Sequence, residues 1–182
     1  MNRKLMAATA ALFLFASPAA FAQEATDNSK AAIETLSKVT TAKDFVANAA
    51  MSDMFEIQTG QMAADQGGSD AVKQFGQMLV QDHGNSSKEL TDLAKAAGSD
   101  AAPPSALDQR HQVIADSLKD AKGSGFDKAF ADAQVQAHEE GIALFKSYGQ
   151  NGDNDQLKAF AQKGLPILQK HLETAQKIAG AQ

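Results

Sequence analysis

The stretch MAADQGGSDAVKQFGQMLVQDH, residues 62–83, contains the clearest indication of the fold. Its DQGGS segment, residues 65–69, is a short break between two long segments with helical composition. After the break, apolar residues recur every three or four positions, which is typical of an amphipathic helix. Ser69 is the expected N-cap of that helix. A connection this short places the helices on either side of it next to each other and antiparallel.

The same helical periodicity continues through the rest of the chain, and no alternating run of β-branched residues predicts a strand. Four long helices and one shorter connector are expected, over residues 42–65, 70–97, 106–121 (the connector), 126–148 and 154–178. Pro166 lies inside the last of these, where it is expected to kink the helix rather than end it. This order predicts an all-α protein, a ferritin-like four-helix bundle with an additional crossover helix between the second and third bundle helices. A plain up-and-down bundle with an extra helix is the alternative.

The N-terminal residues have the features of a secretory signal peptide. A basic start, MNRK, precedes the apolar stretch LMAATAALFLFA and an Ala-Phe-Ala cleavage pattern that ends at Ala22. We therefore expect residues 1–22 to be a signal peptide, residues 23–41 a polar segment with at most a short helix, and residues 42–179 the bundle. Because the apolar stretch is too short to span a bilayer, the expected product is periplasmic or secreted and has no integral membrane segment.

Composition argues against several classes of function. The formal net charge is −5, and removal of Arg3 and Lys4 with the signal peptide would bring it to −7. An acidic chain without a cluster of Lys and Arg is a poor binder of nucleic acid or anionic lipid, since neutralising phosphates supplies most of that affinity. The chain has no cysteine. Disulfides and thiolate ligands are thereby excluded, and a metal would need nitrogen and oxygen ligands.

The segment QAHEEGIALF, residues 136–145, resembles a zinc-protease helix but lacks its second histidine. The H-E-x-x-H motif needs two imidazoles one helical turn apart, and the fifth position here is Ile142. His138 instead lies on the apolar face of its predicted helix. His83 and His171 have the same kind of position on two other helices. Any partners of His138 must therefore come from elsewhere in the chain.

Glu56 is the inward polar residue of the first predicted bundle helix, so that each bundle helix carries one such residue. Imidazole and carboxylate ligands on facing helices are how bundle interiors bind transition metals. The predicted metal ligands are Glu56, His83, His138 and His171. Asp82 and Gln134 are expected to orient the ligating imidazoles through hydrogen bonds. His111, on the connector, is expected to be exposed.

Four stretches together resemble a known family: FEIQTGQMA (55–63), VKQFGQMLVQDHGNSSKEL (72–90), FDKAFADAQVQAHEEGIALF (126–145) and LKAFAQKGLPILQKHLETA (157–175). They are similar to a secreted bacterial family of unknown function that is often labelled "outer membrane protein" and grouped with the ferritin-like bundles. The resemblance covers roughly residues 42–178. It gives weight to Glu56, Asp82, His83, His138, Pro166 and His171. It implies a ferritin-like bundle and export, and it implies no activity.

The site differs from a di-iron centre, which uses Glu-x-x-His pairs on two helices. The residues three positions before the site histidines are Val80, Val135 and Leu168. The favoured hypothesis is therefore one bound transition-metal ion, Zn, Fe, Mn or Cu, in a protein for metal handling or stress protection. Two alternatives are a mononuclear metal oxidoreductase and a metal-free structural or interaction protein. The sequence leaves open whether the chain has a protein partner or forms a homo-oligomer.

Overall fold

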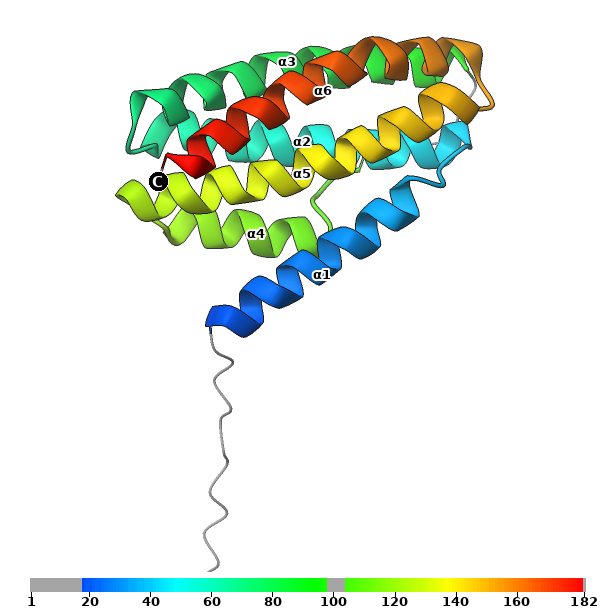
Figure 1. Ribbon diagram of the computed structural model, residues 1–182. Coiled ribbons are helices and arrows are strands. Elements are labelled where there is room, and N and C mark those ends of the chain that lie inside the picture. Colours follow the sequence, from blue (N-terminus) through cyan, green and yellow to red (C-terminus); the bar gives the residue numbers. More distant parts are fainter. Residues whose placement is uncertain (1–17, 98–103, 182) are drawn as a thin grey trace, which may run out of the picture.

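A computed structural model describes residues 18–97 and 104–181, and within these ranges the protein is helical and has no strands (Figure 1). Most of the predicted signal peptide, residues 1–17, lies outside the described residues. The six helices are α1 (Pro18–Leu36), α2 (Ala42–Gln66), α3 (Asp70–Ala96), α4 (Gln109–Asp120), α5 (Gly123–Asn151) and α6 (Asp155–Gly180). The expected all-helical class is confirmed.

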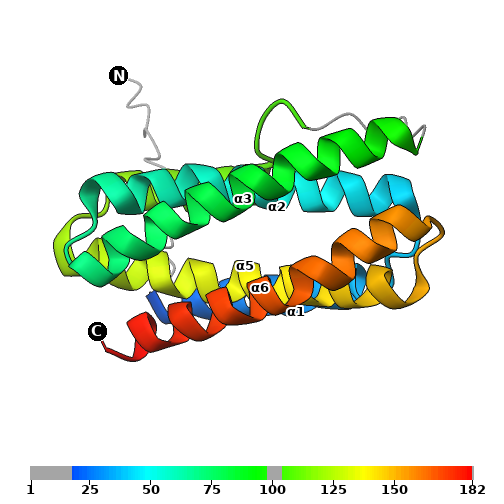
Figure 2. The same cartoon turned by 90° about the horizontal axis from the view of Figure 1, so that it is seen from above.

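Two antiparallel helix pairs make up most of the molecule. Helix α2 packs along α3, and α5 packs along α6, as the short connections after Gln66 and Asn151 require. The two pairs lie beside each other (Figure 2), and they meet through contacts of α2 with α5 and of α3 with α6. The short helix α4 lies against α2 and α5. Four long helices thus surround one interior, and α4 connects α3 with α5.

Polar side chains cap four of the helices at their N-termini. Each cap accepts a hydrogen bond from a backbone N–H that has no partner inside the helix. The caps are Thr41 for α2, Ser69 for α3, Asp108 for α4 and Asn154 for α6. Because Asp108 is the cap, α4 begins at Gln109 and not at residue 106. Helix α6 continues through Pro166, which costs it one backbone hydrogen bond.

Helix α1 is longer than the short helix expected within residues 23–41, and it packs on α5. Hydrogen bonds also hold the linker after it and the first residue of α2 in place. The Ser147 hydroxyl donates to the Val39 carbonyl at 3.0 Å, and the Asp153 carboxylate accepts from the Ala42 N–H at 2.8 Å. The predicted cleavage position after Ala22 falls within the first turns of α1. Among the described residues, none of the helices combines the length and the apolar character that spanning a bilayer requires.

The apolar core is divided into two clusters by a layer of buried polar side chains. One cluster contains Phe45, Leu90, Phe145 and Phe160. The other contains Phe75, Leu79, Phe126 and Phe130. Between these positions, on each of the four long helices, lie the residues that we call the polar layer: Asp53, Glu56, Thr59, His83, Gln134, His138 and His171. Burying so many polar groups at one level is costly unless they bind one another or a ligand.

Glycines bring α2 and α3 close together beside this layer. A Cβ atom added to Gly76 would lie 2.5 Å from the Gly60 carbonyl oxygen, well inside contact distance. Only glycine permits such an approach of two helix backbones. Gly60 is about one turn from Glu56 and Gly76 about two turns from His83, so this contact fixes the two helices that carry four of the seven residues of the polar layer.

Candidate metal centre

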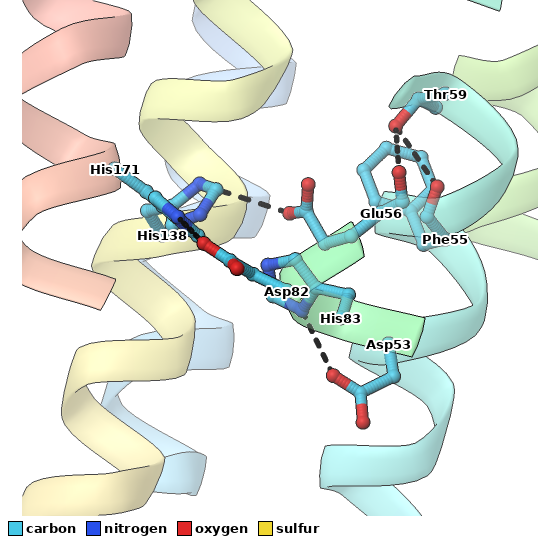
Figure 3. Close-up of polar contacts among 8 residues, drawn as sticks. All are labelled: Asp53, Phe55, Glu56, Thr59, Asp82, His83, His138 and His171. Atoms are coloured by element: carbon cyan, nitrogen blue, oxygen red, sulfur yellow. Dashed lines mark hydrogen bonds and ion pairs between the residues drawn. The ribbon is translucent and has the colours of Figure 1, made fainter. Parts of the chain in front are cut away.

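Three buried imidazoles from three different helices converge in the polar layer. His83 comes from α3, His138 from α5 and His171 from α6, and each is at most 4% exposed (Figure 3). One ring nitrogen of each lies within 4.8 Å of one ring nitrogen of the others. The ring centroids are 5.3 to 5.8 Å apart. The predicted convergence of these three residues is thus present in the structure.

Each imidazole is held by one hydrogen bond to an oxygen acceptor. The pairs are His83 Nδ1 with Asp53 Oδ1 at 2.8 Å, His138 Nδ1 with the Gln134 carbonyl oxygen at 2.9 Å, and His171 Nε2 with Asp82 Oδ2 at 3.0 Å. Since an acceptor oxygen requires the facing ring nitrogen to carry the proton, these bonds fix the tautomer of each neutral ring. When a ring is neutral, its opposite nitrogen carries an unprotonated lone pair.

These opposite nitrogens have no hydrogen-bond partner among the described residues. They are Nε2 of His83, Nε2 of His138 and Nδ1 of His171. A buried polar atom left unsatisfied costs roughly 1–3 kcal/mol. Three unsatisfied ring nitrogens in one place would lower the stability of a purely structural core considerably. A single cation bound by all three lone pairs would remove it.

Glu56 lies beside the three imidazoles, although it is not part of their closest group. Its carboxylate is 1% exposed, and Oε1 is 3.7 Å from Nδ1 of His138. That nitrogen is the one bound to the Gln134 carbonyl, so the contact does not use the free lone pair of the ring. Oε2 of Glu56 has no hydrogen-bond partner in the described ranges. The four predicted ligand residues are therefore neighbours, with the carboxylate at the side of the imidazole cluster.

Burial and mutual charge set the protonation of this group in the metal-free protein. Burial raises the pKa of Glu56 to about 7, and the charge of His83 opposes the shift. Burial and the charge of His83 hold the pKa of His138 well below its ordinary value. The pKa of His171 is lowered for the same reasons. Two of the three imidazoles are therefore neutral at neutral pH, which is the form that binds metals.

His83 differs from the other two because carboxylates surround it. Burial alone would lower its pKa, but the hydrogen bond to Asp53 and the charge of Glu56 together raise it. In the metal-free protein His83 therefore holds a second proton more tightly than the other two imidazoles do. A divalent cation in its place would displace this proton and satisfy the same carboxylates.

The two residues expected to orient the imidazoles do contact them, one of them through a different atom. Asp82 accepts from His171, across the interface between α3 and α6. Gln134 uses its backbone carbonyl, while its side-chain Nε2 donates to the Thr59 hydroxyl at 3.1 Å. The acceptor of His83, Asp53, was absent from the prediction. The available signal was its position one helical turn before Glu56, on the same face of α2.

His111 is not exposed, contrary to expectation. Its side chain is 15% exposed, and Nδ1 lies 2.9 Å from Oδ1 of Asp108, the cap of α4. Its ring centroid is 5.0 Å from that of Phe55. Because α4 packs on α2, His111 is partly covered. It does not belong to the imidazole cluster.

The fold and the site define the protein as a helical domain with a buried three-histidine cluster. The family model described as "Domain of unknown function (DUF4142)" matches residues 22–178, and the chain belongs to this family. The resemblance of the sequence to a family of unknown function is confirmed at that level. Comparison with curated proteins and with solved structures gave no match.

Proposed function

We propose that this protein binds one divalent transition-metal ion in its interior and serves in metal handling or stress protection in an exported location. The free nitrogens of His83, His138 and His171 are the proposed ligands. Nitrogen ligands with a neighbouring carboxylate suit Zn, Fe, Mn or Cu. The absence of thiolates argues against soft-metal sites such as those for Cu(I).

The strongest support for a metal site is that each imidazole of the cluster has one nitrogen in a hydrogen bond and one nitrogen without a partner among the described residues. Metal-ligating histidines typically donate their other ring N–H to a carboxylate or a backbone carbonyl, which fixes the ring and raises its basicity. Asp53, Asp82 and the Gln134 carbonyl occupy these three positions here. A set of histidines serving only as packing would be expected to satisfy both nitrogens of each ring.

Glu56 is the proposed fourth ligand, through its free Oε2 atom. A rotation of its side chain would bring this carboxylate from the edge of the imidazole cluster to a shared ion. Its charge would also offset one of the two positive charges that the metal brings into the core. The ligand set is then three imidazoles and one carboxylate around a single ion.

We further propose that the fold is ferritin-like, with α2, α3, α5 and α6 as the bundle and α4 as the crossover helix. The packing of α2 on α3 and of α5 on α6, with α4 between the pairs in sequence, supports this. A ferritin-like bundle places its metal ligands on facing helices, projecting into the bundle interior. The polar layer has that position between the two apolar clusters.

Metal titration tests the proposal. Chelator-treated full-length protein should bind one equivalent of Co²⁺ per chain, with the intense visible absorption of a four-coordinate ion. Zn²⁺ should displace it, because Zn²⁺ favours the same geometry. Elemental analysis of the protein purified without added metal then identifies the native ion. Failure to bind Co²⁺ or Zn²⁺ at micromolar concentrations would contradict the metal site and favour a metal-free structural role.

A further inference from the structure

A cavity of about 210 Å³ reaches the imidazole cluster between α3 and α6. His83 and His171 line it, together with their acceptors Asp53 and Asp82, and the two histidines and Asp53 are almost fully buried. Lining residues farther along are exposed, such as Ile167 at 43%. The cavity thus leads from the surface to two of the three proposed ligands.

The two walls of this cavity differ in chemistry. The α3 wall carries an oxygen-bearing side chain at nearly every turn, namely Asp82, Asn85, Ser86 and Glu89. Position 82, positions 85 and 86, and position 89 follow one another at intervals of three or four residues, which places the side chains in one row along the helix. The wall from α5 and α6 is mainly apolar, with Phe145, Phe160, Ile167 and Leu168. A cation in the cavity would therefore find its ligands along α3.

An exposed ion pair lies at the outer end of the oxygen row. Lys163 Nζ on α6 contacts both carboxylate oxygens of Glu89 at 2.9 and 3.0 Å. The side chains are 67% and 44% exposed, so the pair is screened by solvent and breaks readily. While the pair is closed, the Lys163 ammonium occupies the carboxylate that an incoming cation would meet first.

We propose that this cavity is the uptake route for a divalent metal ion, with Glu89 as the first contact and Lys163 as its competitor. The ion passes along the oxygen row of α3, exchanging water for side-chain oxygens, and reaches the free nitrogens through the opening beside His83 and His171. The route rests on the proposed metal site. Carboxylates outnumber the one lysine among its lining residues, so the field in the cavity attracts cations.

The rate of Co²⁺ binding to the metal-free full chain, followed by stopped-flow absorption, tests the route. Lys163→Met frees Glu89 and should speed binding about threefold at low ionic strength, and added salt should reduce the effect. Glu89→Gln should slow binding by a similar factor. Lys128→Met is the matched control, because Lys128 is an equally exposed lysine paired with Asp132 and does not line this cavity.

A steric variant makes the test independent of charge. Ser86→Leu adds bulk within the oxygen row, one turn from His83, and should slow both Co²⁺ binding and its removal by a chelator while the stoichiometry stays at one. Unchanged rates in Lys163→Met and Ser86→Leu, with one equivalent still bound, would overturn the route and leave the site intact. An equal acceleration in Lys128→Met would also overturn it. Absence of Co²⁺ binding in the unaltered chain would overturn the site and the route together.

Discussion

Replacing His138 with leucine should lower the affinity for Co²⁺ by more than about 100-fold and leave the metal-free protein folded. Loss of residues that merely orient ligands typically costs 10–100-fold in metal affinity, and loss of a ligand costs more. Leucine is apolar and close to histidine in size, and position 138 is 1% exposed in a core next to Phe75. The substitution therefore removes the lone pair without leaving a large cavity. Calorimetric titration measures the affinity, and circular dichroism checks the fold.

The matched control is His111→Leu, on α4 and outside the imidazole cluster. It should bind Co²⁺ as the unaltered protein does. Thermal unfolding adds a second measurement, since Co²⁺ at about 1,000 times its dissociation constant stabilises the folded state by roughly 4 kcal/mol. That gain should persist in His111→Leu and vanish in His138→Leu. Equal affinity and equal stabilisation in both variants would show that the ion binds elsewhere.

Glu56→Gln should stabilise the metal-free protein at pH 8 by roughly 3 kcal/mol and have little effect at pH 4.5. Burial raises the pKa of Glu56 in the folded state to about 7, from an ordinary value of 4.5. Between these two values the folded state holds a proton that the unfolded chain has lost, so this group lowers stability as the pH rises. Each pKa unit of difference between the folded and unfolded states corresponds to about 1.4 kcal/mol of stability. This stability is lost only between the two pKa values, so the loss is complete above pH 7. Glutamine resembles the protonated acid and carries no such penalty.

Urea denaturation of both proteins at several pH values, with chelator present, measures this difference. Glu139→Gln is the control, because Glu139 is an exposed neighbour of His138 on α5 and the same substitution there should change stability little at any pH. A stability difference between Glu56→Gln and the unaltered protein that does not grow between pH 4.5 and 8 would contradict the assigned environment of Glu56. With metal bound, the penalty should disappear because the cation favours the ionised carboxylate.

The helices of the bundle could be predicted because their apolar residues recur with helical period and their breaks contain Gly, Pro and capping residues. The expected bounds of α2, α3 and α6 agree with the structure to within two residues. Helix α5 begins three residues before the expected Phe126, through a KGSG segment whose composition is typical of a loop. Gly123 has a φ of 56° there, which glycine adopts without strain.

The three imidazoles of the site could be predicted because each is a polar residue within an apolar stripe. Their acceptors were harder to assign. Asp82 contacts His171 on α6 and not an imidazole of its own helix, which depends on how α3 and α6 pack. Gln134 accepts from His138 through its backbone carbonyl oxygen, which every residue has, so its side chain gave no signal of this contact. Asp53 accepts from His83 across the interface of α2 and α3, where the glycine contact brings the two helices close together. Such pairings follow from tertiary packing, which one-dimensional periodicity does not contain.

Anomalous diffraction from crystals of the Zn²⁺-loaded protein shows whether His83, His138 and His171 bind one ion together. We expect one strong peak per chain, about 2.0–2.1 Å from Nε2 of His83, Nε2 of His138 and Nδ1 of His171. Asp53, Asp82 and the Gln134 carbonyl should keep their bonds to the opposite nitrogens. A map with no peak among these three imidazoles, or with zinc bound only by surface carboxylates, would show that the three histidines do not form a metal site.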